Sequence, residues 1–344
     1  VLELHNPNNI KKKGNFLERL IFDEILSTFL INSKIRKTIK KFKKEKKIFD
    51  NNFSNNIQKR LNYELTNDQT NALNEINKYL KSEEKMFRLL QGDVGSGKTI
   101  IALISCFNVV NSGYQVAFMA PTEILAYQHY KLAQSLLKDK IKIDFLTSKT
   151  DYTERKKIIK DLEANKIKIL FGTHSVFQER ITYNKLGLVV IDEQHKFGVK
   201  QRKKLSDKGG KNCDVLVMSA TPIPRTMIMT IFGDMDVTII KQKPKNRKPV
   251  KTYSMVDTKL NEIIDFTKNQ IKKGNQIFWV CPLIEESKKV DHQSAVQRYK
   301  GLQKIFKDRA GLLHGSLDKT DKDKILNKFL NRKIDILIST TVIE

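Results

Sequence analysis

Short apolar runs alternate with amphipathic stretches over much of the chain, and this alternation limits the folds open to it. Between these runs lie helix patterns, for example at 123–137 and 153–165. Strands joined by helices pair in parallel and are covered on both faces. The sequence therefore predicts an α/β fold with a mostly parallel sheet, whose expected strands lie at 87–90, 115–120, 143–146, 167–172, 186–191, 215–219 and 237–240.

A second α/β region follows a break in this pattern. Residues 241–249 hold two prolines and five basic residues, which is typical of an exposed interdomain linker. Beyond it lies an apolar run at 250–256, followed by helices expected at 260–273, 295–307 and 319–329 and by strands expected at 276–282, 312–314 and 334–338. We therefore divide the chain into residues 1–60, 61–240 and 241–344.

The first 60 residues have a different pattern. Residues 16–30 show the spacing of an amphipathic helix, and residues 34–47 hold nine basic residues against one acidic residue, Glu45. A basic helix at this position could contact phosphates or an acidic neighbour; a solvated face on a linker from an upstream domain fits equally well. We therefore predict a helical, basic linker before the first α/β domain.

A glycine-rich loop lies between the expected strand at 87–90 and a helix-like run at 100–110. Glycines let the backbone fold closely around phosphates, and the amides of the loop and of the helix start face the anion. Lys98 is placed to reach the β- and γ-phosphates, and the Thr99 hydroxyl to bind Mg²⁺. The sequence predicts a nucleoside triphosphate site built from Gly92, Asp93, Val94, Gly95, Ser96, Gly97, Lys98 and Thr99.

Two carboxylates directly follow the expected strand at 186–191. Hydrolysis of a triphosphate needs a carboxylate on the metal and a group that orients or deprotonates the attacking water. We predict that Asp192 holds Mg²⁺, directly or through water, and that Glu193 acts on the nucleophilic water.

The residues beside these carboxylates are candidates for coupling hydrolysis to movement. Gln194 and His195 come next, and a histidine fixed there could sense the γ-phosphate, with a purely structural histidine as the alternative. Ser219 and Thr221 end another strand, where small hydroxyls can bond to carboxylates; an ordinary strand-to-helix turn is the alternative. Arg225 lies just beyond, and its fixed guanidinium suits a specific role.

Composition narrows the partners and the compartment. The net charge of +26 would draw the chain to a polyanion such as nucleic acid, unless the lysines are spread over solvated faces. No apolar run approaches the roughly 20 residues that span a bilayer, and no signal peptide opens the sequence, so we expect a cytoplasmic protein. The three cysteines lie far apart in apolar runs, which favours core thiols over disulfides or zinc.

Several longer strings carry a resemblance to a known family. They are residues 92–99, 120–126, 172–174, 192–199, 219–226, 279–287, 314–315 and 339–344. In this order they resemble superfamily 2 helicases, and most specifically the RecG family of bacterial ATP-dependent DNA helicases. The resemblance implies two RecA-like domains that clamp ATP between them and carry DNA across their tops. The second domain is expected to be truncated at Glu344, and residues 2–30 to lead from an upstream wedge domain.

The resemblance also implies roles for individual residues. Tyr63 and Gln69 match the adenine site of the family, where an aromatic ring stacks on the base and an amide meets its edge. Contacts to the DNA backbone are implied for Thr122, Thr173 and His174 in the first domain and for Thr340 and Thr341 in the second. A motor that steps without reading sequence needs such backbone contacts. The implied partners are branched and duplex DNA, held by a monomer.

The implied activity is ATP-driven remodelling of stalled replication forks and Holliday junctions in recombination and repair. Lys196 departs from the arginine usual in the family, and the family's arginine fingers are expected beyond Glu344. We therefore expect residues 1–344 alone to hydrolyse ATP weakly or not at all. The alternatives are the motor of a transcription-repair coupling factor, a P-loop kinase or nucleotide switch without motor activity, and a basic DNA-binding segment without catalysis.

Overall fold

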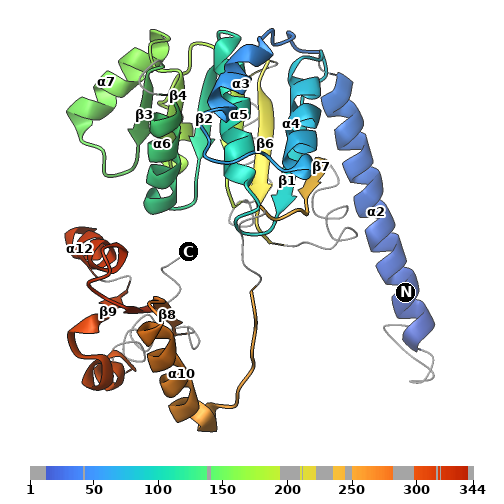
Figure 1. The fold of residues 1–344 in the computed structure, drawn as a ribbon. Coiled ribbons are helices and arrows are strands. Elements are labelled where there is room, and N and C mark those ends of the chain that lie inside the picture. The colour runs from blue at the N-terminus through green and yellow to red at the C-terminus, as the bar shows by residue number, and fades with distance from the viewer. Residues whose placement is uncertain are drawn as a thin grey trace. The chain divides into compact units, whose positions relative to one another are not determined.

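The fold was analysed in a computed structural model. The structure describes residues 13–41, 43–137, 141–193, 210, 212–221, 235–244, 250–281, 298–314, 317 and 319–339. It divides into two compact units, Val1–Lys248 and Pro249–Glu344 (Figure 1). The finer division at residues 60 and 240 stays a prediction.

The first unit is built on one parallel sheet. Within the described residues the sheet has seven strands in the order β3-β4-β2-β5-β6-β1-β7, and every pairing between them is parallel. The predicted α/β fold with a parallel sheet is confirmed. The strands are β1 (Phe87–Gly92), β2 (Gln115–Met119), β3 (Ile143–Leu146), β4 (Ile169–Gly172), β5 (Leu186–Ile191), β6 (Asp214–Ser219) and β7 (Asp236–Ile240).

Helices cover both faces of this sheet. Successive side chains of a strand point to opposite faces, so each strand contributes to two separate cores. Leu90 and Val190 pack into one core with residues of α3 to α6, whereas Leu89 and Val189 pack into the other core with residues of α7. Figure 1 shows α4, α5 and α6 together on one side of the strands. The helices are α3 (Asn51–Gln58), α4 (Asn67–Leu80), α5 (Lys98–Asn111), α6 (Glu123–Leu137) and α7 (Tyr152–Glu163).

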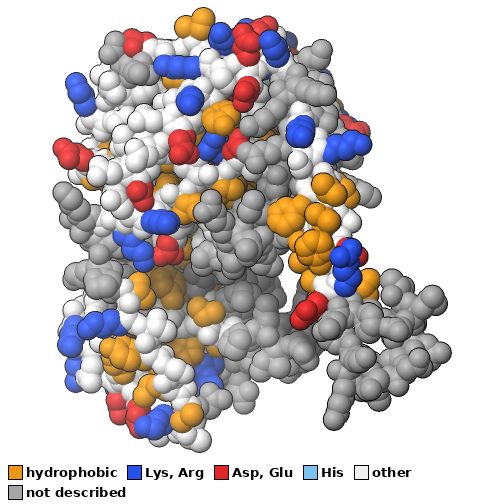
Figure 2. Space-filling model, turned by 90° about the vertical axis from the view of Figure 1, so that its right-hand side faces the viewer, with side chains coloured by type: hydrophobic (Ala, Val, Ile, Leu, Met, Phe, Trp, Pro, Cys, Tyr) orange, Lys and Arg blue, Asp and Glu red, His pale blue; other side chains and the backbone are white. Residues whose placement is uncertain are grey.

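The long helix α2 (Lys13–Lys41) precedes this sheet. Many of its apolar side chains are exposed, among them Leu17, Phe22 and Leu30, and Figure 2 shows apolar side chains gathered along the helix. The helix ends at Lys41, so the basic helix predicted over 34–47 is wrong beyond that point.

Two lysines that follow this helix are buried in the first unit. Lys44 and Lys47 each place Nζ 2.6 Å from Oδ2 of Asp214, the first residue of β6. Lys44 also donates to the carbonyl of Tyr79, and Lys47 to that of Asn212. Neither proposed use of the basic run, phosphate contact or a solvated face, applies to these two side chains. They fasten the segment after α2 to the start of β6.

This buried cluster predicts a pH dependence of stability. Burial lowers the pKa of Lys44 to about 8 from 10.5, although the nearby Asp214 opposes the shift. Between these two pH values the unfolded chain binds more protons than the folded chain does. The unfolding free energy that Lys44 contributes therefore rises as pH rises from about 8 to 10.5, and it is lost again as pH falls back to about 8. We expect the unfolding free energy of the wild type to rise between pH 8 and 10 relative to that of Lys44→Met. Urea unfolding of both proteins across this range tests it; a difference independent of pH would contradict the assignment.

The second unit contains a smaller parallel sheet. Its described strands are β8 (Ile277–Val280), β9 (Ala310–Leu313) and β10 (Ile336–Ser339), in the order β8-β10-β9. Around them lie η4 (Asp257–Lys259), α10 (Leu260–Lys272), a helix over 298–306, η5 (Lys307–Arg309) and α12 (Lys319–Leu330).

The apolar run at 250–256 forms no strand. Its residues are exposed, including Val250, Tyr253 and Val256, and no described strand pairs with it. Apolar composition alone does not make a strand, because a strand also needs a partner for its backbone hydrogen bonds.

The cysteines are placed as predicted. Cys106, Cys213 and Cys281 are buried and free, so the prediction of core thiols is confirmed. Among the described residues, no helix combines the length and the apolar composition that crossing a membrane requires.

Candidate nucleotide-binding and catalytic site

Three neighbouring strands bring the predicted catalytic segments to one edge of the first sheet. Strands β5, β6 and β1 lie side by side and run in parallel, with Ile191 opposite Val217 and Gln91 opposite Ser219. Their carboxyl ends lead to Asp192, to Ser219 and to the glycine-rich loop. Ligands of open parallel sheets bind at this edge. The three segments, scattered over more than a hundred positions in the sequence, are therefore adjacent in the fold.

The glycine-rich loop turns sharply between β1 and α5. Gly95 has φ of 74° and Gly97 has φ of 89°, in the left-handed region that side chains disfavour. A Cβ atom at Gly97 would lie 2.2 Å from Nε2 of Gln69. Position 97 therefore requires glycine for its backbone conformation and for the close approach of α4.

The polar groups of this loop form a cradle suited to phosphate. Nζ of Lys98 donates to the carbonyls of Gly92 at 2.7 Å and Asp93 at 3.2 Å, which holds the ammonium within the loop. Ser96 Oγ is buried and has no protein hydrogen-bond partner, and an orphaned polar atom of this kind calls for a ligand or water. The amino end of α5, where Thr99 occupies the first turn, adds partial positive charge. These residues fit a triphosphate.

The two residues assigned to adenine, Tyr63 and Gln69, differ from each other in exposure and contacts. Gln69 is 1% exposed, and its Nε2 donates to the carbonyl of Ser96 at 2.7 Å while its Oε1 accepts from the amide of Thr66. Gln69 thus closes a capping box at the start of α4 and ties this helix to the phosphate loop. Tyr63 is 46% exposed, which leaves its ring accessible for stacking, and partial burial raises its pKa. Their adenine contacts stay predictions.

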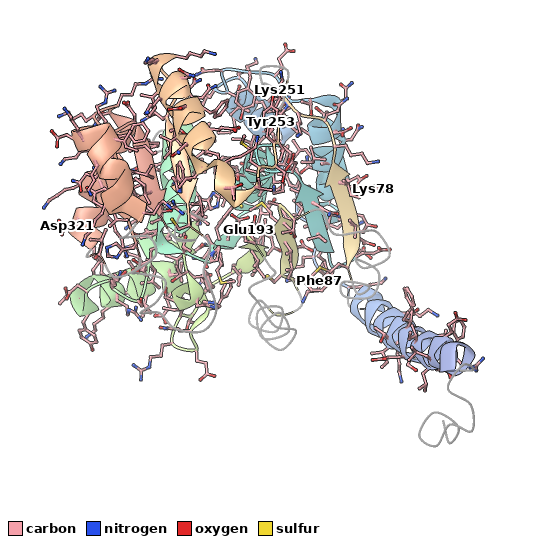
Figure 3. All side chains as sticks on the ribbon, turned by 90° about the horizontal axis from the view of Figure 1, so that it is seen from below. Lys78, Phe87, Glu193, Lys251, Tyr253 and Asp321 are labelled. Carbon is pink, nitrogen blue, oxygen red and sulfur yellow. The ribbon has the colours of Figure 1, made fainter. Side chains whose placement is uncertain are left out.

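The predicted metal ligand and catalytic base follow β5. Asp192 is 8% exposed, and its amide donates to the carbonyl of Met119 on β2 at 2.9 Å. Glu193, labelled in Figure 3, donates its amide to Oδ1 of Asp192 at 3.1 Å and has a positive φ of 50°. A non-glycine residue in this region is uncommon and points to a locally constrained turn. The separate roles of the two carboxylates, on the metal and on the water, stay predictions.

Sequence reasoning missed one residue of this site. His129, on α6, places Nε2 2.8 Å from Oδ2 of Asp192, and its side chain is at least as buried as that of Asp192. A signal for it does exist: Ala126, His129 and Ala133 share the buried face of an amphipathic helix, where a lone polar side chain needs a partner. The sequence could have indicated a buried histidine, although not the identity of its partner.

The coupling residues are only partly described. Ser219 Oγ lies 2.8 Å from Thr221 Oγ1 and accepts from the Thr221 amide at 3.3 Å, so the two hydroxyls bond to each other. Gln91 on β1 donates to the carbonyl of Thr221 at 3.1 Å, which joins this turn to the base of the phosphate loop. Gln194, His195 and Arg225 lie outside the described residues.

The residues assigned to DNA in the first domain lie along the same sheet edge. Thr122 follows β2, and its Oγ1 accepts from the amide of Leu125 at the start of α6. Thr173 follows the adjacent strand β4, with Oγ1 3.3 Å from Ser175 Oγ, and His174 opens the short helix η2 (His174–Phe177). Because β2 is also the neighbour of β5, this group continues the row that holds Asp192. Thr340 and Thr341 lie outside the described residues.

Sequence comparison matches two helicase families to the chain. The model of the DEAD/DEAH box helicase family matches residues 66–230, and that of the helicase conserved C-terminal domain matches residues 258–344. The ATP-dependent DNA helicase RecG of Thermotoga maritima is 42% identical over 99% of this chain and 44% of its own length. The same helicase of Bacillus subtilis is 41% identical over 99% of this chain and 50% of its own length. The chain spans about half the length of these relatives.

Comparison with solved structures agrees. A structure of RecG bound to a three-way DNA junction has a TM-score of 0.77 and 39% identity, covering 95% of this chain and 43% of that one. The DEAD-box helicase Mss116 bound to single-stranded RNA has a TM-score of 0.63 and 17% identity, covering 85% of this chain and 64% of that one. At 17% identity, the similarity to Mss116 concerns the fold alone. The fold is that of a RecA-like helicase core.

Proposed function

We propose that this chain, which belongs to the RecG family of ATP-dependent DNA helicases, carries the ATP-hydrolysing motor of a protein that remodels branched DNA. One observation carries the proposal: β5, β6 and β1 place Asp192, Ser219 and the phosphate loop side by side, and β2 and β4 extend this row with Thr122 and Thr173. A nucleotide site and a DNA track on one rigid sheet edge are what a translocating ATPase needs.

At the nucleotide site each residue has a defined task. The loop amides and Lys98 bind the phosphates, and Thr99 and Asp192 hold Mg²⁺, which when bound neutralises phosphate charge and aligns the terminal phosphoryl group. Glu193 orients the attacking water and accepts its proton. Tyr63 and Gln69 contact the adenine. Gln194, His195, Ser219, Thr221 and Arg225 relay the state of the site to the rest of the motor.

At the DNA track the proposed contacts are to the backbone. Thr122, Thr173 and His174, with Thr340 and Thr341 from the second unit, hold phosphates and not base edges, so binding is independent of sequence. The similarity to a solved structure of RecG bound to a three-way DNA junction supports branched DNA as the substrate class. We propose that the protein acts as a cytoplasmic monomer on stalled forks and Holliday junctions during recombination and repair.

The comparisons favour the RecG assignment over the alternative functions. A transcription-repair coupling motor shares the fold, but the 41–42% identities to RecG proteins favour the first reading. A P-loop kinase or nucleotide switch has no need of a second parallel-sheet unit matching the helicase C-terminal family.

The discriminating experiment is DNA-stimulated ATP turnover by the natural full-length protein. We expect turnover to rise several-fold when a three-way junction is added at saturating ATP. A kinase or switch would hydrolyse ATP at a rate indifferent to DNA. Turnover unchanged by junction, fork and duplex DNA would contradict the proposed motor.

Binding to DNA is expected to depend steeply on salt and hardly at all on sequence. Each phosphate neutralised by the protein releases counterions, so the logarithm of affinity falls linearly with the logarithm of salt concentration. Titrations on junctions of equal geometry and unrelated sequence, between about 50 and 200 mM salt, measure both properties. A flat salt response, or a marked preference for one sequence, would contradict backbone tracking.

A further inference from the structure

A buried hydrogen bond connects a helix that starts at the DNA track to the metal-binding carboxylate. His129 Nε2 and Asp192 Oδ2 are 2.8 Å apart, and both residues are less than a tenth exposed. In so dry a setting a hydrogen bond to a carboxylate is strong, and removing its donor leaves the acceptor without water to replace it. Asp192 therefore depends on His129 for its orientation.

The same histidine packs against one of the strands that lead to the DNA residues and is linked through it to the other. Its ring centroid lies 4.9 Å from that of Phe118 on β2, and Phe118 in turn stacks on Phe171 of β4 at 5.1 Å. Strand β2 continues to Thr122, and β4 continues directly to Thr173. Helix α6 adds a third connection, since it begins just after Thr122 and carries His129 two turns further on.

These contacts make His129 the point at which the DNA-facing segments meet the nucleotide site. Close-packed interiors do not deform continuously, so a small displacement of α6 or of the Phe118–Phe171 pair moves the histidine with it. Any such movement changes the position of the Asp192 carboxylate, because the two side chains share a hydrogen bond.

We propose that His129 is a positioning residue that holds Asp192 for Mg²⁺ and couples DNA contact at Thr122 and Thr173 to nucleotide binding. This proposal rests on the proposed function, since it assumes that these threonines meet DNA and that Asp192 serves the metal. It assigns to α6 a second task besides covering the sheet. Partners that orient a metal-binding carboxylate contribute about 10- to 100-fold to metal affinity.

Three substitutions separate the hydrogen bond from the packing. His129→Leu fills the space and removes the donor. His129→Gln places an amide Nε2 the same number of bonds from Cβ as the histidine Nε2, so it keeps the donor. Gln128→Ala, at the exposed neighbouring position of α6, is the matched control.

The experiment measures equilibrium binding of a fluorescent, non-hydrolysable ATP analogue to the full-length protein across Mg²⁺ concentrations, with and without a three-way junction. For His129→Leu we expect the Mg²⁺ concentration at half-maximal binding to rise about 10-fold. We also expect the effect of DNA on nucleotide affinity to disappear, while DNA affinity without nucleotide stays at the wild-type value. His129→Gln should retain both properties largely, and Gln128→Ala fully.

Outcomes of this series are distinguishable. A wild-type response to Mg²⁺ and to DNA in His129→Leu overturns the inference, as does equal loss in the leucine and glutamine variants, which would indicate packing alone. Wild-type ATP turnover indifferent to DNA overturns the proposed function itself. Should the leucine variant fail to fold, His129→Asn, whose amide is one bond too short to reach Asp192, takes its place with the same expectations.

Discussion

Lys98→Ala is expected to abolish measurable ATP turnover by the full-length protein while leaving its fold intact. The ammonium of Lys98 lies inside the phosphate loop, held by the carbonyls of Gly92 and Asp93. It is the side-chain charge placed to stabilise the β- and γ-phosphates as negative charge shifts between them. Loss of one preorganised group of this kind lowers turnover on the order of 10² to 10³-fold.

Steady-state turnover with saturating ATP and DNA measures this effect. Lys78→Ala is the control, because Lys78 is an exposed lysine in the last turn of α4, labelled in Figure 3, and its removal changes the net charge equally. Thermal melting of both variants separates lost chemistry from lost folding. Turnover of Lys98→Ala within a factor of a few of wild type would mean that the loop does not bind the reacting phosphates.

Glu193→Gln is expected to separate nucleotide binding from hydrolysis. Glutamine keeps the shape of the side chain and removes its ability to accept a proton from water. Asp192 remains in place for the metal, with its own contacts to Met119 and His129. Turnover should therefore fall by about 10² to 10⁴-fold, the usual contribution of a general base, while nucleotide affinity stays near the wild-type value.

Parallel measurements of analogue binding and of single-turnover hydrolysis test this separation. Glu163→Gln, at the exposed end of α7, is the matched control. If Glu193→Gln weakens nucleotide binding as much as it slows hydrolysis, then Glu193 shapes the turn after β5 and does not act on the water.

The strands of the first sheet were predictable because each is a short run made mostly of apolar residues, even where a polar residue such as Arg88 or Asp144 lies within it. The runs at 143–146 and 186–191 were placed at their observed bounds, and the others within two residues of theirs. Strands buried on both faces give such a mainly apolar signal. Since the predicted catalytic residues come directly after strand ends, their shared position at one sheet edge was predictable as well.

Features that depend on distant partners were not predictable. The basic run after α2 suggested a charged surface, but Lys44 and Lys47 are buried on Asp214, about 170 positions away. His129 likewise finds Asp192 across 63 positions. Charge counts and periodicity describe local composition, whereas these contacts are set by how the chain folds back on the sheet.

The apolar run at 250–256 also shows that local composition does not supply a pairing partner. Its residues have the composition of a strand, yet no described strand pairs with them and they stay exposed. Gln69 differs again: the family resemblance implied an adenine contact, which stays a prediction, whereas its contact with the Ser96 carbonyl could only be seen in the structure.

Strand separation of a three-way DNA junction tests the central claim, that the site formed by the phosphate loop, Asp192 and Glu193 powers movement on branched DNA. The natural full-length protein would be compared with its Lys98→Ala variant, each with ATP and with a non-hydrolysable analogue. We predict strand separation by the wild type with ATP only, and equal junction binding by both proteins. Strand separation by Lys98→Ala, or by the wild type without hydrolysis, would contradict the account.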